Sequence, residues 1–231
     1  MSKFYNESNK EIIINLSEDK LIGVGCFGVV YRLNENECFK RFNSKEPRGA
    51  NYEELVFIRN LNLKNFYKIY DFVFDNNDIL KGYTMKYYNN EKIDILTMPT
   101  EYTLDNLYNI YSSVLKITDN NIYLNDMGEH NIIMDNNKIT IIDADWYSFN
   151  TFESKKALLY SNIVELRYLF EEIYTNALEE YHDTYIDESS EFIISNLFKK
   201  INKFTGIENF CRKLERYKYP IDYIKKLSRR R

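Results

Sequence analysis

The chain has 231 residues, of which 44% are hydrophobic and 29% are charged, so it can bury a core and form one domain that could divide into two lobes. Its formal net charge of -4, from 31 basic and 35 acidic residues, gives no overall field that would attract nucleic acid or an anionic membrane, and we expect neither as a partner. Cys26, Cys38 and Cys211 are too few and too widely spaced for a disulfide framework or a zinc site of paired thiolates.

The cysteine usage is typical of a reducing compartment, and we expect a soluble, cytoplasmic protein. The early apolar run Ile12–Ile14 is too short for a signal-peptide core, and no later run approaches the length of a membrane-spanning helix. An effector that is exported by another route would share these features. The basic run Arg229–Arg231 is expected to be a solvated tail.

The first part of the chain is predicted to be rich in strands. A strand, a tight glycine turn and a second strand are expected within Ile12–Leu33, followed by a strand at Cys38–Phe42. Between Asn51 and Leu61, apolar residues recur at intervals of three, which predicts one face of a helix. Two further strands are expected at Phe66–Phe74 and Gly82–Tyr88.

The second part is predicted to be mainly helical. Thr103 is expected to open a helix, and short strands at Ile132–Met134 and Lys138–Ile142 should flank a turn. After Ser161 we expect only helices, near Ile163–Tyr174, Glu191–Ile201 and Ile207–Tyr217. Strands followed by helices are typical of an α+β protein.

The segment from Gly23 to Tyr31 resembles the glycine-rich loop of protein kinases, with Gly23, Gly25 and Gly28 at its spacing. The resemblance implies that the loop backbone approaches ATP phosphates and that Val30 covers the adenine. A dinucleotide-binding turn or a bulged hairpin would also use such a glycine pattern. A strand rather than a helix is expected after Gly28, which disfavours the dinucleotide-binding turn.

Lys40 lies at the position of the kinase lysine that pairs with the α- and β-phosphates, although a surface lysine would also fit here. Its expected partner on the following helix is Glu54, with Glu53 as the alternative. Met85 and Tyr87 occupy the position of the segment that receives adenine through backbone groups.

Two acidic constellations follow. Asp126 precedes Asn131 by five residues, the spacing of the kinase catalytic loop, and an apolar strand delivers Asp143 at the position of the metal-binding aspartate. The resemblance implies that Asp126 orients the acceptor hydroxyl and takes its proton. It also implies that Asn131 and Asp143 hold Mg²⁺, with Asp145 as a further ligand.

Each of these residues alone could be an ordinary turn, cap or surface residue. Together they occur in the family's order between Leu21 and Asp145, so the chain resembles the protein-kinase-like superfamily. The resemblance implies an α+β, bilobal kinase-like fold. A small antiparallel sheet lobe with one helix, residues 1–88, would bind the nucleotide, and a mainly helical catalytic lobe would span residues 89–231.

The pattern also departs from that of regulated protein kinases. Leu124 and Asn125 replace the usual His-Arg pair, and Gly128 replaces a lysine that neutralises the γ-phosphate. The segment that begins at Asp143 lacks the Phe and Gly that follow the aspartate in the kinase motif. Its two acidic residues, Asp143 and Asp145, resemble those of choline kinases and aminoglycoside kinases. If a helix begins at Ser161, the segment after Asp145 is short and offers little platform for a peptide.

The predicted function is an ATP- and Mg²⁺-dependent phosphotransferase acting on a hydroxyl. A protein Ser/Thr acceptor is narrowly favoured over a small-molecule hydroxyl. A nucleotide-binding pseudokinase module and an enzyme that adenylylates its target stay open as alternatives.

Overall fold

The computed structural model describes residues 2–43, 52–89, 94–143, 147–149, 154–185, 209 and 211–228, the side chains of 179–185 excepted. Its contacts divide the chain into two compact units. The sheet unit comprises Met1–Asn62, Tyr67–Asn89 and Asp143–Tyr147, and the helical unit comprises Leu63–Phe66, Asn90–Ile142 and Ser148–Arg231. The predicted helix Glu191–Ile201, residues 207, 208 and 210 of the predicted helix Ile207–Tyr217, Asp145 and Arg229–Arg231 lie outside the described residues.

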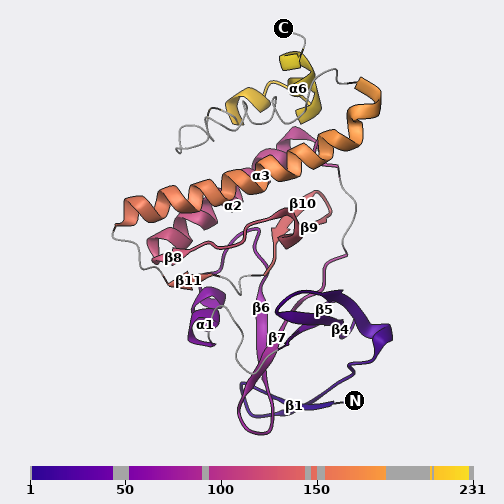
Figure 1. The fold of residues 1–231 in the computed structure, drawn as a ribbon, viewed down its shortest axis with the longest axis vertical. Coiled ribbons are helices and arrows are strands. Elements are labelled where there is room, and N and C mark those ends of the chain that lie inside the picture. The colour runs from indigo at the N-terminus through magenta and orange to yellow at the C-terminus, as the bar shows by residue number, and fades with distance from the viewer. Residues whose placement is uncertain are drawn as a thin grey trace. The chain divides into compact units, whose positions relative to one another are not determined.

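The sheet unit contains a curled, antiparallel, seven-stranded sheet, drawn in indigo and purple in Figure 1. The strand order is β2-β1-β6-β7-β5-β4-β3, so β2 and β3 are the two edges. The strands are β1 (Ser2–Asn6), β2 (Glu11–Ile14), β3 (Leu21–Val24), β4 (Gly28–Arg32), β5 (Glu37–Phe42), β6 (Ile69–Phe74) and β7 (Leu80–Lys86).

The glycine turn joins β3 to β4 as predicted, but the sequence did not reveal β1. This strand exists because it pairs with β2 on one side and with β6 on the other, where Tyr5 lies opposite Phe74. A polar turn closes the β1–β2 hairpin, because the Asn6 side chain accepts the backbone N–H groups of Ser8 and Lys10. Long-range pairing therefore stabilises a segment whose local pattern is weak.

Strand alternation gives the sheet two faces. On one face, called the Lys40 face, Lys40 and Phe72 both lie opposite Tyr83, and helix α1 (Tyr52–Asn60) packs there with its Tyr52 ring 5.0 Å from that of Phe72. On the other, called the Thr84 face, Thr84 lies opposite Phe39. A buried cluster of Phe4, Ile14, Phe39 and Val73 forms the core on this second side.

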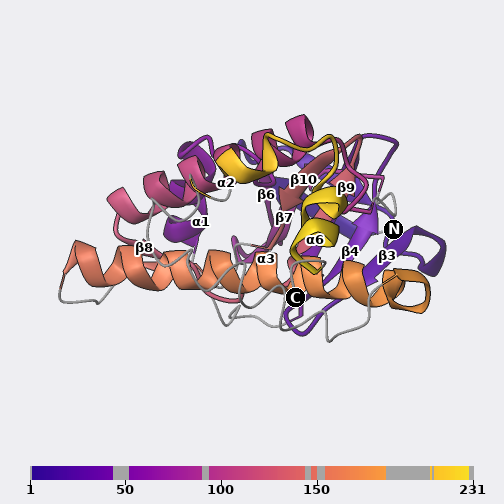
Figure 2. The ribbon, with the colours of Figure 1, turned by 90° about the horizontal axis from the view of Figure 1, so that it is seen from above.

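The helical unit is built on two long helices, α2 (Thr100–Asp119) and α3 (Lys155–Tyr185), which lie side by side (Figures 1 and 2). The short helix α6 (Pro220–Ser228) is tied to the segment that precedes α2 through the Ile221 N–H, which donates to the Leu96 carbonyl. The unit also contains an antiparallel hairpin of β9 (Ile132–Asp135) and β10 (Lys138–Ile141). A second antiparallel pair is formed by β8 (Ile122–Tyr123) and β11 (Ser148–Phe149), which are far apart in the sequence.

Buried amides fix the β9–β10 hairpin against α2. The Asn65 Nδ2 donates to the Asn106 Oδ1 at 2.6 Å and to the Ile139 carbonyl at 2.7 Å. The Asn106 Nδ2 in turn donates to the Asn137 carbonyl. Both asparagines are buried, so these bonds replace hydration that the amides lost on folding.

Two predicted helix starts are wrong. α2 begins at Thr100, directly after Pro99, and Thr103 lies inside the helix, where it is buried. α3 begins at Lys155 rather than Ser161, because the Ser154 hydroxyl caps the helix by accepting the Ala157 N–H at 3.2 Å. Within the described part of the chain, none of the helices is long and apolar enough to cross a membrane.

Gly82 is the position where a side chain would disturb the sheet most. Its φ is +152°, and an added Cβ would lie 1.9 Å from the Lys40 carbonyl oxygen. Gly82→Ala should therefore lower the free energy of unfolding by about 2–4 kcal/mol, measured by urea denaturation followed by circular dichroism. Gly23→Ala is the control, because its Cβ would meet nothing nearer than 3.9 Å. Equal stabilities of the two variants would contradict the packing described for β5 and β7.

Candidate functional site

The predicted site residues fall in both units. The sheet unit contains the glycine turn, Lys40, Glu54 and Asp143, and the helical unit contains Asp126 and Asn131. Asp145, the further metal ligand expected from the sequence, lies outside the described residues.

Lys40 and Asp143 form an ion pair, although they lie far apart in the sequence. The Lys40 Nζ is 2.6 Å from the Asp143 Oδ2, and the two side chains are 7% and 27% exposed. Lys40 lies in the middle of β5, between β4 and β7, and its aliphatic stem lies beside Gly28 of β4. A buried ammonium is stable only when its charge is compensated, and Asp143 supplies a carboxylate for this purpose.

Both aspartates singled out by the sequence have left-handed backbone. The φ angle is 62° at Asp126 and 65° at Asp143. This region is sparsely populated by residues other than glycine, although Asp and Asn enter it more readily than most. Residues in such conformations are enriched at functional sites, where the surrounding structure holds them in place.

The glycine turn is held by Asn43, the residue that follows β5. Its backbone N–H donates to the Phe27 carbonyl at 2.9 Å, and its side-chain amide donates to the Gly25 and Cys26 carbonyls at 3.2 and 3.3 Å. The Gly25 N–H also donates to the Gly28 carbonyl. The sequence analysis did not identify Asn43. The one signal it offered was the position of this asparagine directly after a predicted strand.

The three glycines of the turn differ in what the fold requires. An added Cβ on Gly28 would lie 2.8 Å from the Arg41 carbonyl and 3.2 Å from the Lys40 Cε, so Gly28 leaves room for the lysine stem. At Gly23 and Gly25 an added Cβ would make only ordinary contacts, and neither residue has a positive φ. The folded chain itself therefore does not require glycine at these two positions.

The remaining predicted nucleotide residues surround Lys40 in the sheet unit. Val30 lies directly opposite Lys40 on β4, and Met85 is buried on β7 opposite Cys38. On α1, Glu54 is half-buried whereas Glu53 is exposed, which favours Glu54 as the carboxylate nearer the core.

Tyr87 is engaged within the sheet unit. Its backbone N–H donates to the Asn36 carbonyl at 2.9 Å, and its ring lies 4.4 Å from the Arg32 guanidinium. In this conformation an adenine would have to use other backbone groups of the segment.

The loop from Asp126 to Asn131 is organised by Asn131, which is buried. Its Nδ2 donates to the Asp126 carbonyl at 2.8 Å and approaches the Asp126 Oδ2 at 3.4 Å. The Asn131 carbonyl accepts the N–H of Ile142, the residue that precedes Asp143 in the chain. The Asp126 side chain is 46% exposed and is therefore open to an incoming group.

Gly128 and His130 are adjacent in this loop. An added Cβ on Gly128 would lie within 2.6 Å of the His130 ring, so the imidazole occupies the space beside the glycine. The His130 Nε2 is 3.5 Å from the Asp126 Oδ2, which is long for a hydrogen bond.

α3 presents a row of polar side chains to this loop, which sequence reasoning also missed. Asn162 is fully buried and accepts the Leu124 N–H at 2.9 Å, while its amide donates to the Thr118 hydroxyl and the Ile122 carbonyl. Further along the helix, Glu172 accepts the Glu129 N–H at 2.8 Å. Polar residues at helical spacing in an otherwise apolar stretch were the available signal.

Glu165 belongs to the same row. It accepts a hydrogen bond from the Tyr123 hydroxyl at 3.3 Å. Burial raises the pKa of the Glu165 carboxyl above its ordinary value, and the negative charge of Asp126 adds to the rise. The Tyr123 hydroxyl and the Met127 N–H act in the opposite direction.

The pKa of the Glu165 carboxyl is raised in the folded state relative to the unfolded state. Its contribution to the free energy of unfolding is therefore fully present below the unfolded-state pKa, and it is lost as pH rises through the folded-state pKa. Glu165→Gln cannot ionise. Its free energy of unfolding, relative to that of the unmutated chain, should therefore increase between about pH 4 and about pH 7, by less than about 1 kcal/mol because the group is half-exposed. Urea denaturation across this range measures the effect, with the exposed Glu101→Gln as control. A constant or opposite difference would contradict the burial argument.

Each unit contains an oxygen ligand of the kind that a hard cation takes when it is bound together with phosphate. Mg²⁺ takes oxygen ligands and is bound through one or two carboxylates plus phosphate oxygens and water. Asp143 supplies a carboxylate, and Asn131 keeps its side-chain oxygen for a ligand because its nitrogen donates to Asp126. Three clustered His, Cys, Asp or Glu side chains are not found among the described residues, and such a cluster is not what a phosphate-bridged Mg²⁺ needs.

Comparisons with known proteins assign no family. No protein-family model matches the chain, and no curated protein matches it either.

Proposed function

We propose that the protein is an ATP- and Mg²⁺-dependent phosphotransferase, whose two units are the two lobes of a protein-kinase-like fold. One observation carries the proposal. Among 31 basic and 35 acidic residues, the family pattern selects Lys40 and Asp143 as the groups that meet at the nucleotide, and the two lie 2.6 Å apart. A random choice of one cation and one anion would rarely give a pair at this distance with the cation buried.

The glycine turn supports the proposal independently. The fold itself does not require glycine at position 23 or 25, because a side chain there would meet no close contact. A ligand whose phosphates approach the backbone would supply the missing reason. Gly28 has a different role, since it leaves room for the stem of Lys40.

In the proposed reaction, bound MgATP supplies the γ-phosphoryl group. Lys40 would pair with the α- and β-phosphates, with Glu54 orienting its ammonium group, and Asp143 and Asn131 would hold Mg²⁺, which would neutralise charge on the phosphates. Asp126 accepts the proton of the acceptor hydroxyl. The bond from the acceptor oxygen to the γ-phosphorus forms as the bond from that phosphorus to the bridging oxygen breaks, and ADP leaves.

The acceptor is a hydroxyl group. A protein Ser/Thr hydroxyl is proposed on the resemblance of the glycine turn. A small-molecule hydroxyl is the second candidate, and the start of α3 favours it. Because α3 begins at Lys155, residues 144–154 alone connect Asp143 to this helix, fewer than the sequence predicted.

Lys40→Met and Asp143→Asn should each reduce phosphoryl transfer by at least about 100-fold, because each removes a charge that positions the nucleotide or its metal. The measurement is transfer of label from γ-labelled ATP to protein extracts and, separately, to a panel of amino-alcohols and aminoglycosides. Lys10→Met and Asp19→Asn are matched controls at exposed positions. Equal transfer of label by Asp143→Asn and by the unmutated chain would contradict the proposal that the protein is a phosphotransferase.

Cys26 gives a readout of nucleotide binding that does not need turnover. It is the exposed cysteine of the glycine turn, whereas Cys211 is buried and burial raises the pKa of Cys38 to about 12. A thiol reagent should therefore modify Cys26 in the folded protein, and MgATP should slow this reaction several-fold. Lys40→Met should lose the protection, and Cys26→Ser should lose the labelling.

The two measurements together separate the alternatives. Protection of Cys26 without transfer of label would indicate a pseudokinase module. If MgATP did not protect Cys26 from the thiol reagent, the proposal that the nucleotide binds at the glycine turn would be wrong. Transfer of AMP in place of phosphate, detected by mass spectrometry of the product, would indicate adenylylation.

A further inference from the structure

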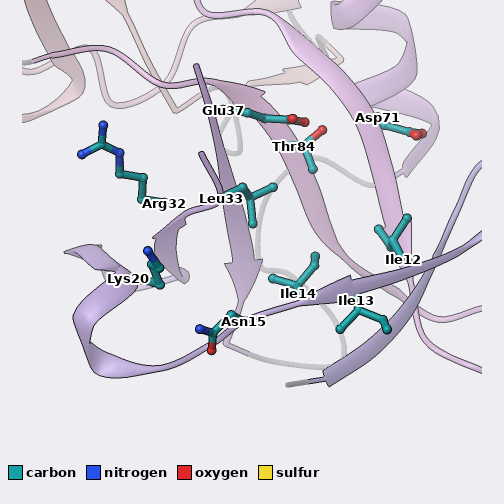
Figure 3. Close-up of a pocket in the computed structure, with 10 residues that line it drawn as sticks. All are labelled: Ile12, Ile13, Ile14, Asn15, Lys20, Arg32, Leu33, Glu37, Asp71 and Thr84. Carbon is teal, nitrogen blue, oxygen red and sulfur yellow. The ribbon is translucent and has the colours of Figure 1, made fainter. Parts of the chain in front are cut away.

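A pocket of about 340 Å³ lies on the Thr84 face of the sheet, the face opposite to that of Lys40 (Figure 3). Its volume is at the lower end of the range of small-molecule sites in proteins, about 300–1,000 Å³. All of its lining residues belong to the sheet unit. The proposed phosphotransferase gives this pocket no role.

The pocket follows from the curl of the sheet. Edge strand β2 contributes Ile12 and Ile14. Leu33 directly follows β4, and Lys20 ends the short helix that precedes the other edge strand, β3. The side chains of Ile12, Ile14 and Leu33 form an apolar surface on one side of the pocket. This surface would bind the apolar body of a ligand.

Thr84 provides the first sign that the pocket takes a polar group. It is 5% exposed, and its Oγ1 makes no hydrogen bond to any residue that the structure describes. A buried hydroxyl without a partner costs free energy, because it has lost its hydrogen bonds to water. Because Thr84 lines the pocket, a ligand bound there can remove this cost.

Two carboxylates accompany this hydroxyl. Asp71 lies directly opposite Thr84 across β6 and β7, and Glu37 lies diagonal to it on β5, two residues from Phe39, which faces Thr84. Figure 3 shows the oxygens of Glu37 and Thr84 at the same end of the pocket. Glu37 forms no ion pair with any described residue. Asp71 accepts the Glu7 N–H at 3.4 Å, and its pKa is raised by burial and by its hydrogen bond with the Glu7 side chain.

The basic residues that line the pocket are directed elsewhere. The Arg32 guanidinium lies over the Tyr87 ring at 4.4 Å, and its Nε donates to the Asn34 carbonyl at 3.2 Å. Lys20 is 4.0 Å from Asp19, and Figure 3 shows it at the opposite end from Glu37. The end of the pocket beside Thr84 is therefore electronegative.

We propose that this pocket binds a small molecule with an apolar body and a primary ammonium group. An ammonium donates hydrogen bonds, and one end of the pocket offers two acceptors, the Thr84 hydroxyl and the Glu37 carboxylate. The apolar body packs against Ile12, Ile14 and Leu33. A carboxylate or phosphate in the same position would face the like charge of Glu37 without compensation.

The test compares three probes of equal chain length, n-hexylammonium, n-hexanol and n-hexanoate, by isothermal titration calorimetry with the full chain at neutral pH. Hexylammonium should bind, and hexanol and hexanoate should bind at least about tenfold more weakly, because they lack the charge-assisted hydrogen bonds. No heat with hexylammonium at millimolar concentration, or equal binding of hexanoate, would overturn the proposal.

Two conservative variants locate the probe. Glu37→Gln and Thr84→Val should each weaken hexylammonium binding, the former by about tenfold. Glu35→Gln changes an exposed carboxylate two residues from Glu37 and should leave the affinity unchanged. Circular dichroism of each variant checks that it folds, and unchanged binding by both folded pocket variants would overturn the proposal.

Lys40→Met and Asp126→Asn separate this pocket from the proposed phosphotransferase site. Both variants should bind hexylammonium as the unmutated chain does. Loss of binding in either variant would place the amine at the acceptor or nucleotide site and overturn the pocket proposal. Failure of the kinase assays would leave the binding result unaffected, because the pocket lies on the other face of the sheet.

Discussion

The buried charge of Lys40 is the constraint around which the sheet unit is organised. An ammonium group in the interior must meet a carboxylate, and Asp143 meets it at 2.6 Å. The strand that carries Lys40 has a glycine beside it on each neighbouring strand. Gly28 on β4 makes room for the lysine stem, and Gly82 on β7 makes room for the lysine carbonyl. The lysine can be buried because both flanking strands give up a side chain.

The helical unit holds its own polar loop by a different means. There the backbone from Leu124 to Glu129 hydrogen-bonds to side chains on α3, with the buried Asn162 at one end and Glu172 further along. Asn131 closes the loop from inside through the Asp126 carbonyl. The left-handed conformation of Asp126 is therefore supported on both sides, which keeps an exposed carboxylate in a fixed place.

The sequence predicted the elements whose signals are local. The strands on either side of the glycine turn, helix α1 and the β9–β10 hairpin each follow from a short apolar pattern with a turn or periodic face. β1 was missed because pairing with β2 and β6 stabilises it, and the start of α3 was missed because Ser154 was not recognised as a cap. Lys40 and Asp143 could be chosen from motif spacing alone. Asn43, Asn162 and the pocket beside Thr84 could not, because their roles depend on which distant backbone groups folding brings within reach.

The attachment of the glycine turn to Asn43 has a mechanical consequence. Asn43 follows β5 directly, and its main chain and side chain together hold three carbonyl groups of the turn. The turn is therefore fastened to the same strand that carries Lys40, three residues away. A displacement of the glycine turn should therefore also displace the end of β5. We expect the glycine turn and Lys40 to move together.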